Sequence, residues 1–252
     1  MKLFFKYLFP FITAIGFSQN SVAIDSLEQL LQKETITEKK IVLHLKLYEN
    51  KPNKDKAFVN LEQAEELISD ATQDSIKANV YLLKSQYYLK AHNYDEVINY
   101  VGKALEFRYA ISADNLIKAY SDLGSANYYK TKYKEAIRAH QQAMRVCETN
   151  GYTERKARVL NNIGITYIKL KDWKNAEKYM YDSYELCKQF NNQRGATYTL
   201  GNLGIIYKNL GQFDDAISMY QKSLEISLAL DDKVALIRNY TNIGSLYDNQ
   251  KK

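Results

Sequence analysis

The chain of 252 residues contains only two prolines, Pro10 and Pro52, and none after position 52. Because proline disrupts helix interiors, its absence leaves most of the chain free to form long helices. The alternation of polar and apolar residues that marks strands is also missing, whereas apolar residues recur at helical spacing. These features predict an all-α protein.

Residue patterns of common catalytic and metal sites are missing too. The three histidines lie 48 residues apart, and no HExxH, CxxC, GxSxG or phosphate-binding glycine loop occurs. We therefore expect no enzyme activity, no metal site and no cofactor. The net charge of +6 comes from interspersed acids and bases, so no basic stripe predicts nucleic-acid binding by this segment.

The first 18 residues differ from the rest of the chain. Two lysines precede an apolar stretch over residues 8–17, and small residues occupy Gly16 and Ser18. This order is typical of a secretory signal peptide, with cleavage expected after Ser18 or, as a second choice, after Ala23. The alternative is a membrane anchor, which would need about 20 apolar residues. We expect an exported protein of the periplasm or cell envelope.

Four glycines recur at intervals of 40 residues, namely Gly124, Gly164, Gly204 and Gly244. We number each repeat from this glycine, which is position 0. Large residues recur at −4, −1 and +3 (with Asn127 as the exception at +3), an aromatic residue at +9, alanine at +12 and a small residue at +19. Positions −4, −1, 0 and +3 share one face of a helix, and +12, +16 and +19 share one face of a second helix.

The repeat predicts pairs of closely packed helices. Small residues at 0 and +12 allow two helices to cross near the low end of the usual ~8–10 Å range. Gly211 suits the left-handed residue that ends a helix. One such hairpin cannot cover its own apolar face, so successive hairpins must stack.

The pattern large-x-x-[LI]-G-x-x-Y, followed by an aromatic residue, alanine and a small residue, resembles the tetratricopeptide repeat (TPR). The resemblance covers residues 117–247. The 40-residue period and the missing late proline are similar to the longer-repeat subclass of kinesin light chains and bacterial Rap-type regulators. The resemblance implies a right-handed TPR superhelix, an α-solenoid of stacked antiparallel helix hairpins.

The solenoid is expected over residues 24–252. Five repeats and a half repeat are expected, at about 38–70, 77–110, 117–150, 157–190, 197–230 and 232–249. The second repeat fits with its second helix one residue late, as if its turn had gained a residue. A short capping helix is expected at 24–35. The helix at 232–249 is either the cap of the array or half of a hairpin in a longer chain.

The first helices of stacked hairpins line the concave side of a solenoid. In the TPR family an asparagine at −2 often binds the backbone of an extended peptide, and the resemblance transfers this role to Asn162, Asn202 and Asn242. An amide offers both a donor and an acceptor, as a peptide unit does. The alternative is that these asparagines hydrogen-bond within the stack.

Two further rows of side chains are expected on the same face. Lys118, Arg158, Tyr198 and Arg238 occupy −6, and Tyr128 and Lys208 occupy +4. The cations at −6 would attract acidic partners, and the residues at +4 would add side-chain pockets. A two-carboxylate clamp is not expected, because positions −3 and −2 carry no cations.

Cys147 and Cys187 both occupy +23, so they lie one repeat step apart. That step is at least a helix packing distance of ~8–10 Å. A disulfide needs Cα atoms within ~7 Å, so we expect two free, buried cysteines. A bridge between them would require a distorted stack.

The leading interpretation is a non-enzymatic scaffold that binds a protein or peptide in its concave groove. The alternative is the extracytoplasmic sensor region of a histidine kinase or transcriptional regulator. It rests on similarity to exported bacterial TPR arrays that continue into a membrane helix and a kinase or helix-turn-helix module. A third interpretation is an intracellular Rap-like regulator whose first residues are not a signal.

Overall fold

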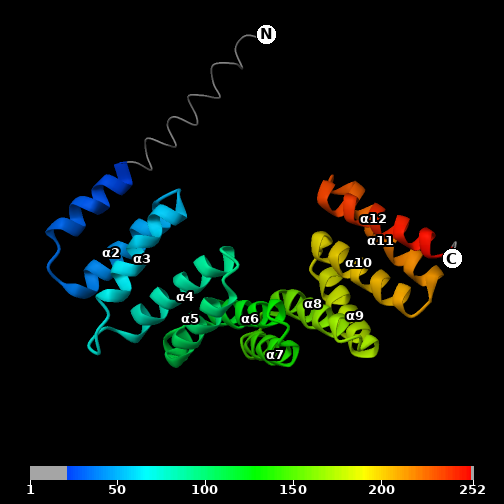
Figure 1. Ribbon diagram of the computed structural model, residues 1–252, viewed down its shortest axis with the longest axis horizontal. Coiled ribbons are helices and arrows are strands. Elements are labelled where there is room, and N and C mark those ends of the chain that lie inside the picture. Colours follow the sequence, from blue (N-terminus) through cyan, green and yellow to red (C-terminus); the bar gives the residue numbers. More distant parts are fainter. Residues whose placement is uncertain (1–21, 251–252) are drawn as a thin grey trace, which may run out of the picture. The chain divides into compact units, whose positions relative to one another are not determined.

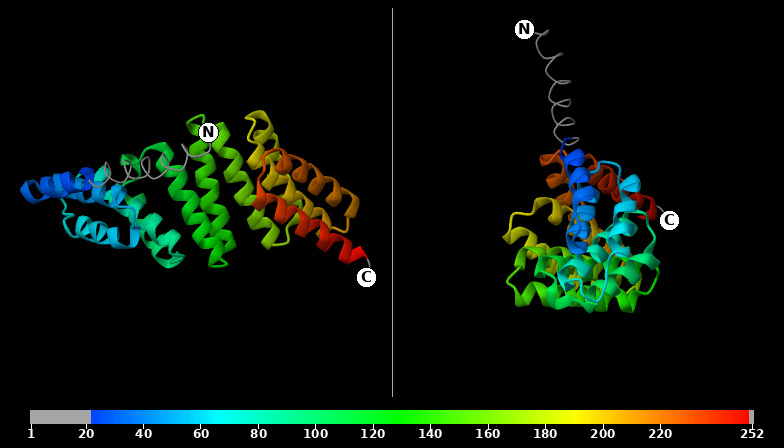
Figure 2. Two further views of the ribbon diagram at one scale, coloured as in Figure 1. Left: turned by 90° about the horizontal axis from the view of Figure 1, so that it is seen from above. Right: turned by 90° about the vertical axis from the view of Figure 1, so that its left-hand side faces the viewer.

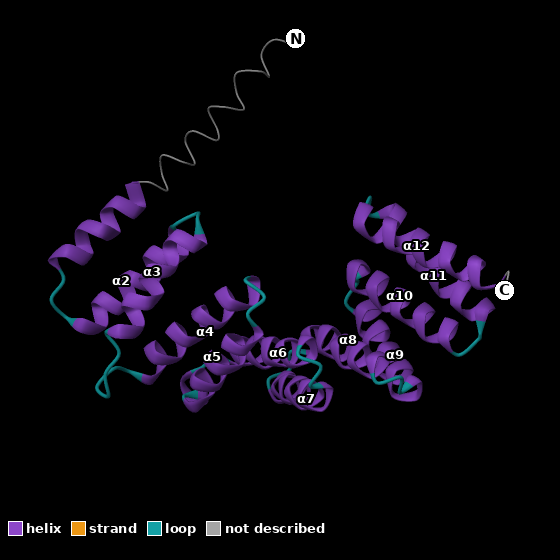
Figure 3. Cartoon of the chain, viewed as in Figure 1, coloured by secondary structure: helices purple, strands orange, loops and turns teal. Residues whose placement is uncertain are grey.

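The structure, a computed structural model, describes residues 22–250, with side chains to Tyr247. The expected signal peptide, residues 1–18, lies outside the described residues. Over the described part the chain forms only helices and loops (Figure 3), so the all-α fold is confirmed. The chain divides into two compact units, Met1–Ile111 and Ser112–Lys252, which we call unit 1 and unit 2.

Unit 2 is a regular array of paired helices. They are α6 (Ala113–Tyr129), α7 (Tyr133–Thr149), α8 (Thr153–Lys169), α9 (Trp173–Gln189), α10 (Gln193–Asn209), α11 (Phe213–Ala229) and α12 (Lys233–Gln250). Helices α6 to α11 each have 17 residues and are joined by connections of three residues, which produces the period of 40. Figure 1 shows α6 and α8 on one side of this unit and α7 and α9 on the other.

The repeat glycines allow a large side chain to pack between the helices of each pair. The glycine at position 0 faces the residue at +16 of its own second helix. A Cβ atom built on Gly204 would lie 2.3 Å from Cε1 of Tyr220, and one on Gly164 would lie 2.8 Å from Cε of Met180. The predicted close crossing is therefore confirmed, and the ring or thioether at +16 is the reason for the glycine.

The second helices of unit 2 present one fully covered face. Its nine residues at +12, +16 and +19 are each at most 2% exposed: Ala136, His140, Ala143, Ala176, Met180, Ser183, Ala216, Tyr220 and Ser223. Burying such a face supplies most of the helix stability, because an isolated helix of this length is marginal in water.

The three-residue connections of unit 2 share one backbone form. The middle residue has positive φ in each of them: Thr131, Gly151, Lys171, Asn191, Gly211 and Asp231. The next N–H donates to the carbonyl five residues earlier, as from Gln212 to Tyr207 at 2.9 Å. These are the left-handed ends that close a helix and reverse the chain. The prediction for Gly211 is confirmed.

Unit 1 contains two hairpins of less regular build. Its helices are α2 (Thr37–Asn50), α3 (Lys54–Glu66), α4 (Asp74–Lys90), α5 (Tyr94–Glu106) and a 3₁₀ turn η1 (Arg108–Ala110), and residues 22–33 are also helical. Helices α3 and α5 have 13 residues, four fewer than α7, and longer connections follow them.

The expectation of a longer turn in the second repeat is wrong. The connection between α4 and α5, residues 91–93, is as short as that between α6 and α7. Ser85 occupies the glycine position of this repeat, buried at 1% exposure. Counted from Ser85, the residues of α5 fall at the usual +9, +12, +16 and +19: Tyr94, Val97, Val101 and Ala104. The second repeat is instead one residue shorter than the later repeats, since Ser85 precedes Gly124 by 39 residues and not 40. This difference arises between α5 and α6.

Both cysteines lie in unit 2, on α7 and α9. Cys147 and Cys187 are free and buried, with exposures of 1% and 4%. Burial raises the pKa of both thiols, which keeps them protonated and unreactive. The regular stack therefore places them as the repeat spacing predicts.

Candidate functional site

The first helices of unit 2 form a continuous face. Helix α8 contacts α6 and α10, and α10 also contacts α12. We call the surface formed by α6, α8, α10 and α12 the first-helix face. Every predicted peptide-binding residue lies on one of these four helices.

The three predicted asparagines have different surroundings. Asn162 is half-buried and lines a groove between α6 and α8. Asn202 donates from Nδ2 to Oδ1 of Asn161 at 3.1 Å, which links α10 to α8. The Nδ2 atom of Asn242 is buried and has no hydrogen-bond partner among the described residues. Asn202 thus holds α10 against α8, whereas the side chain of Asn162 lines an open groove.

The residues at −6 also differ in their surroundings. Lys118, Arg158 and Tyr198 are exposed. Arg238 is half-buried, with its guanidinium group 4.1 Å from the centre of the Tyr198 ring. Arg238 therefore packs α12 onto α10. A Cβ atom built on Gly201 would lie 3.7 Å from Nε of Arg238, an ordinary contact distance, so this packing does not require glycine at 201.

Of the two residues at +4, one bonds to a neighbouring helix and the other lines a groove. Lys208 donates from Nζ to Oγ of Ser245 at 2.6 Å, another contact of α10 with α12. Tyr128 is half-buried and packs edge-on against Tyr129 and Tyr133. It lines the same groove as Asn162.

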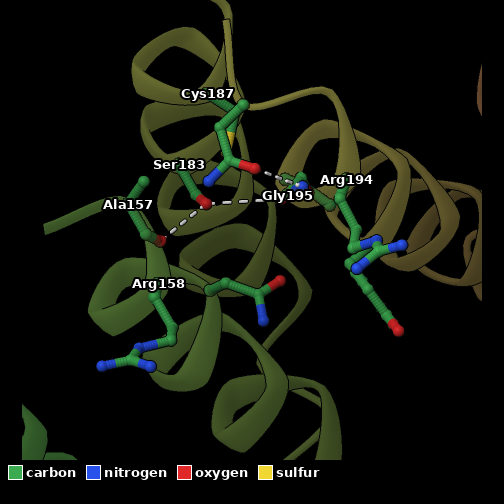
Figure 4. Close-up of a pocket in the computed structure, with 10 residues that line it drawn as sticks. Ala157, Arg158, Ser183, Cys187, Arg194 and Gly195 are labelled. Atoms are coloured by element: carbon green, nitrogen blue, oxygen red, sulfur yellow. Dashed lines mark hydrogen bonds between the residues drawn. The ribbon is translucent and has the colours of Figure 1, made fainter. Parts of the chain in front are cut away.

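A pocket of about 260 Å³ opens between α8 and α10. Its lining residues are Ala157, Arg158 and Asn161 of α8, Ser183 and Cys187 of α9, Asn192, and Arg194, Gly195, Tyr198 and Thr199 of α10. Figure 4 shows Ser183 and Cys187 on α9, with Arg158 and Arg194 on the flanking helices. The lining is mostly apolar, while two guanidinium groups border the opening.

The α9 side of this pocket is held by hydrogen bonds. The Ser183 hydroxyl donates to the carbonyl of Ala157 at 2.8 Å and lies 3.3 Å from Oγ1 of Thr199, and Figure 4 marks both contacts. Thr199 donates to the carbonyl of Gly195 at 3.0 Å. The hydroxyl groups of Ser183 and Thr199 thus already have partners within the protein.

A smaller groove of about 180 Å³ lies one repeat earlier, between α6 and α8. Ser125, Tyr128, Tyr129, His140, Asn162, Ile165 and Thr166 line it. His140 is 2% exposed, and burial lowers the pKa of its imidazole to about 4, so the ring is neutral at pH 7. The groove is thus uncharged and lined by hydroxyl, amide and aromatic groups.

Asp122 occupies −2 where the later repeats have asparagine. Burial raises the pKa of its carboxyl to about 6, although the charges of Lys118 and Arg158 oppose that shift. Near pH 6 a fraction of this carboxyl is protonated and can donate a hydrogen bond, as the amides at −2 do. The face therefore carries hydrogen-bonding groups at −2 in each repeat of unit 2.

Sequence reasoning missed part of the pocket. Arg194, Asn161 and Thr199 were not predicted as site residues. The signal for the α9 side was present, because serine recurs at +19 in Ser183 and Ser223. No pattern marked Arg194, which lies in the first turn of α10 and pairs with Asp232 at 3.3 Å.

Metal-ligand clusters and membrane-spanning helices are not found in the described part of the chain. Within it, no three His, Cys, Asp or Glu side chains are placed to hold a metal ion. Among the described helices, none is both long and apolar enough to cross a bilayer.

The family model described as Tetratricopeptide repeat matches residues 115–189 and 194–252. The chain belongs to the tetratricopeptide repeat family. The TPR match covers α8 and α12 in full and all but the first one or two residues of α6 and α10. No curated protein matches the sequence.

Several solved structures resemble the chain at low sequence identity. BtubC from P. vanneervenii is 18% identical with a TM-score of 0.59, over 88% of this chain and 83% of that one. Aspartyl phosphate phosphatase F from Bacillus subtilis is 16% identical with a TM-score of 0.68, over 85% of this chain and 60% of that one. A Rap protein complexed with Competence and Sporulation Factor is 17% identical with a TM-score of 0.62, over 92% of this chain and 68% of that one. These likenesses show the fold alone.

Proposed function

We propose that unit 2 binds an extended segment of a protein partner along its first-helix face, without catalysis. One observation carries the proposal. The groove at Asn162 and the pocket at Tyr198 follow each other on either side of α8, while Lys118 and Arg158 remain exposed beside them. Within the described residues, the side chains of Asn162, Lys118 and Arg158 form no hydrogen bond or ion pair with a neighbouring helix.

The spacing of the two openings suits an extended chain. Neighbouring first helices lie about 8–10 Å apart, and residues i and i+2 or i+3 of an extended chain span a similar length at ~3.3 Å per residue. One ligand side chain would enter the groove between α6 and α8, and another the pocket between α8 and α10. Between them, the Asn162 amide would bond a peptide unit.

The similarity to a Rap protein complexed with Competence and Sporulation Factor supports binding of a protein or peptide as the class of function. It does not name a ligand for this chain. The ligand class instead comes from the face itself, where exposed cations favour an acidic segment.

The test is capture of synthetic peptides. Immobilised dodecapeptides of acidic, neutral and basic composition would be probed with the full chain. Acidic peptides with apolar side chains are expected to retain it best. Asn162→Ala is expected to reduce capture by about fivefold with little change in melting temperature, since loss of a hydrogen bond to a ligand costs on the order of 1 kcal/mol.

Asn202→Ala is the matched variant. It removes the bond to Asn161, so it is expected to lower the melting temperature. Equal capture by wild type and Asn162→Ala across the whole panel would contradict the proposal. So would equal losses of stability in both variants, which would make Asn162 a structural residue.

We further propose that the protein is exported to the cell envelope, on the strength of residues 1–18 alone. Fractionation of a tagged chain and N-terminal sequencing of the mature form would test this. Recovery from the cytoplasm with residues 1–18 intact would overturn it.

A further inference from the structure

The groove between α6 and α8 has a histidine at its floor. Helix α7 packs against both α6 and α8, and Figure 2 shows α6 and α7, in green, side by side within unit 2. His140 of α7 lines the groove together with residues of α6 and α8, and it is only 2% exposed. The imidazole therefore lies at the bottom of the groove and not at its rim.

Packing holds this ring in place but does not explain why it is an imidazole. A Cβ atom built on Gly124 would lie 2.4 Å from Cε1, 2.5 Å from Nδ1 and 2.6 Å from Nε2 of His140, so the ring lies flush against α6. Met180 fills the same place against Gly164 in the next hairpin. Position +16 thus requires a large side chain, and the ring nitrogens go beyond that requirement.

The polar groups of the groove differ in whether they have partners. The Ser125 hydroxyl donates to the carbonyl of Ser121 at 2.9 Å, and the Thr166 hydroxyl donates to the carbonyl of Asn162 at 2.8 Å. The Nδ1 atom of His140 is buried and has no hydrogen-bond partner among the described residues. Buried polar atoms of proteins nearly always have a partner, so this nitrogen calls for one from outside the protein.

The chemistry of the groove favours an uncharged partner. Burial lowers the pKa of the His140 imidazole to about 4, so the ring is neutral at pH 7, and the other lining side chains carry no charge. A charged ligand group would lose its hydration here without meeting an opposite charge. A neutral imidazole offers one N–H donor and one acceptor nitrogen, so a group with both functions matches either tautomer.

The size of the groove favours a long side chain over a single water molecule. Its volume is about 180 Å³, whereas one water needs only ~10–15 Å³ of cavity volume. Serine and threonine hydroxyls offer a donor and an acceptor, but they are short, and the imidazole lies at the floor. The carboxamide of glutamine offers both functions at the end of a longer side chain.

We propose that the groove between α6 and α8 binds a glutamine side chain of the partner segment, and that His140 recognises its carboxamide. This inference rests on the peptide binding proposed above and adds one residue of the ligand. The Asn162 amide remains available for the backbone of the same segment. His140 is thus a specificity-determining residue of the first-helix face, although it belongs to a second helix.

The test compares acidic dodecapeptides that are identical except for one central residue, which is glutamine, glutamate, leucine or alanine. Each fluorescent peptide is titrated with the full chain, and binding is measured by fluorescence anisotropy. Wild type is expected to bind the glutamine peptide about fivefold more tightly than the other three. That factor corresponds to about 1 kcal/mol, the usual net contribution of one hydrogen bond.

A matched pair of protein variants locates the preference. His140→Met introduces the residue that packs on the glycine of the next repeat, so the chain is expected to fold and to bind the glutamine and leucine peptides within about twofold of each other. His92→Met makes the same change at an exposed histidine between α4 and α5. This control is expected to keep the wild-type preference.

Nitrogen-15 NMR of the histidine rings gives a readout that a merely structural role would not change. The chain has three histidines, so the ring signals of His140 can be assigned by their loss in His140→Met. These signals are expected to shift with the glutamine peptide far more than with the leucine peptide, because only the carboxamide can bond the ring.

Failure of this inference can be told apart from failure of the proposed function. Equal affinity of wild type for all four peptides, or a glutamine preference that His140→Met retains, would overturn the role of His140 and leave peptide binding intact. Either result would mean that water satisfies the ring. Absence of binding to every peptide by wild type would overturn both proposals.

Discussion

At the residue scale, the side chain at +16 explains why glycine occupies position 0 in the internal hairpins. Gly204 lies against the ring of Tyr220, which is 0% exposed and cannot move away freely. We predict that Gly204→Ala lowers the free energy of unfolding by about 1–3 kcal/mol, the usual cost of overpacking a core. Urea denaturation would measure it.

Gly244→Ala is the control for this prediction. Its Cβ atom meets nothing, so alanine gains about 0.5–1 kcal/mol from its better helix propensity. Two changes of identical chemistry are thus expected to have opposite signs. A loss of similar size at both glycines would mean that helix geometry, and not the residue at +16, requires glycine.

His140 should make stability depend on pH. Burial lowers the pKa of its imidazole to about 4, below the unfolded value of 6.5. Between these values the unfolded chain binds more protons, so stability falls as pH drops from about 6.5 to 4, by about 3 kcal/mol. His140→Met places the residue of the next repeat on Gly124 and is expected to remove this dependence.

The measurement is denaturation of wild type and His140→Met across this pH range. His92→Asn is the control, because His92 is exposed. Asp122 acts in the opposite sense: its pKa is raised to about 6, so its ionisation destabilises the folded state as pH rises from about 4 to 6. If His140→Met kept the wild-type pH profile, the ring would not be neutral in the fold.

At the element scale, serine at +19 joins one hairpin to the next. Ser223 lies 2.9 Å from the Thr197 carbonyl on α10 and 2.9 Å from Oδ1 of Asn239 on α12. Asn239 also donates to Ser227 at 3.0 Å. Ser223 and Asn239 form a polar pair between α11 and α12. The equivalent positions between α7 and α8 hold the apolar pair Ala143 and Val159.

We predict that Ser223→Ala costs about 1–3 kcal/mol, because it leaves the buried Asn239 carbonyl oxygen without its donor. Adding Asn239→Val restores the apolar pairing found between α7 and α8. The double variant is therefore expected to be more stable than Ser223→Ala alone. Strict additivity in this double-mutant cycle would contradict the proposed coupling.

Unit 1 replaces an apolar contact with a charged cluster. Lys84 at −1, where the later repeats have Leu or Ile, is 5% exposed and pairs with Glu65 of α3. Glu65 also accepts from the Tyr100 hydroxyl at 2.9 Å and from Lys103 at 3.0 Å. Burial works against ionisation, but these donors together lower the pKa of Glu65.

We predict that Glu65→Gln destabilises the protein by about 2–3 kcal/mol at pH 7, because Lys84 is left buried without a counter-charge. A carboxyl with a lowered pKa stabilises above its unfolded pKa and loses this effect as pH falls. The cost should therefore shrink toward pH 3 in thermal unfolding. Lys84→Leu, the residue of later repeats, should change stability by less than about 1 kcal/mol, since Glu65 keeps two donors.

The sequence predicts elements well where contacts are local and repeated. Pairing of helices and the covered face at +12, +16 and +19 follow from spacing alone, since each hairpin meets the same neighbours. The second repeat was misaligned because Lys84 and Ser85 replace the apolar residue and glycine that set the register. The Glu65 cluster could not be predicted, because it joins three helices through side chains without a repeated pattern.

At the scale of the whole chain, the candidate site was only partly predictable. Residue spacing placed the predicted side chains on one face, but it could not tell which were used by the stack. Asn202, Lys208 and Arg238 each contact a neighbouring first helix, and such contacts depend on the residue opposite. Arg238, for example, packs over the ring of Tyr198, an aromatic residue that the other repeats of unit 2 do not have at −6.

Charge is unevenly distributed over the two sides of unit 2. Its first helices carry mostly bases among their described side chains: Lys118, Arg155, Lys156, Arg158, Lys169, Arg194, Lys208, Lys233 and Arg238. The second helices α7, α9 and α11 are nearly balanced, because their seven bases face eight acids: Glu135, Glu148, Glu177, Asp182, Glu185, Asp214, Asp215 and Glu225. A field of this sense draws acidic segments toward the first-helix face.

We predict that Arg158→Glu weakens capture of acidic dodecapeptides by about tenfold, because it reverses a charge at the opening between α8 and α10. Arg138→Glu makes the same change on the exposed surface of α7 and should have little effect, which separates local recognition from net charge. Salt should weaken wild-type capture, since the Debye length falls from ~10 Å at 0.1 M to ~3 Å at 1 M. Equal losses in the two variants would place the acidic segment elsewhere than on the first-helix face.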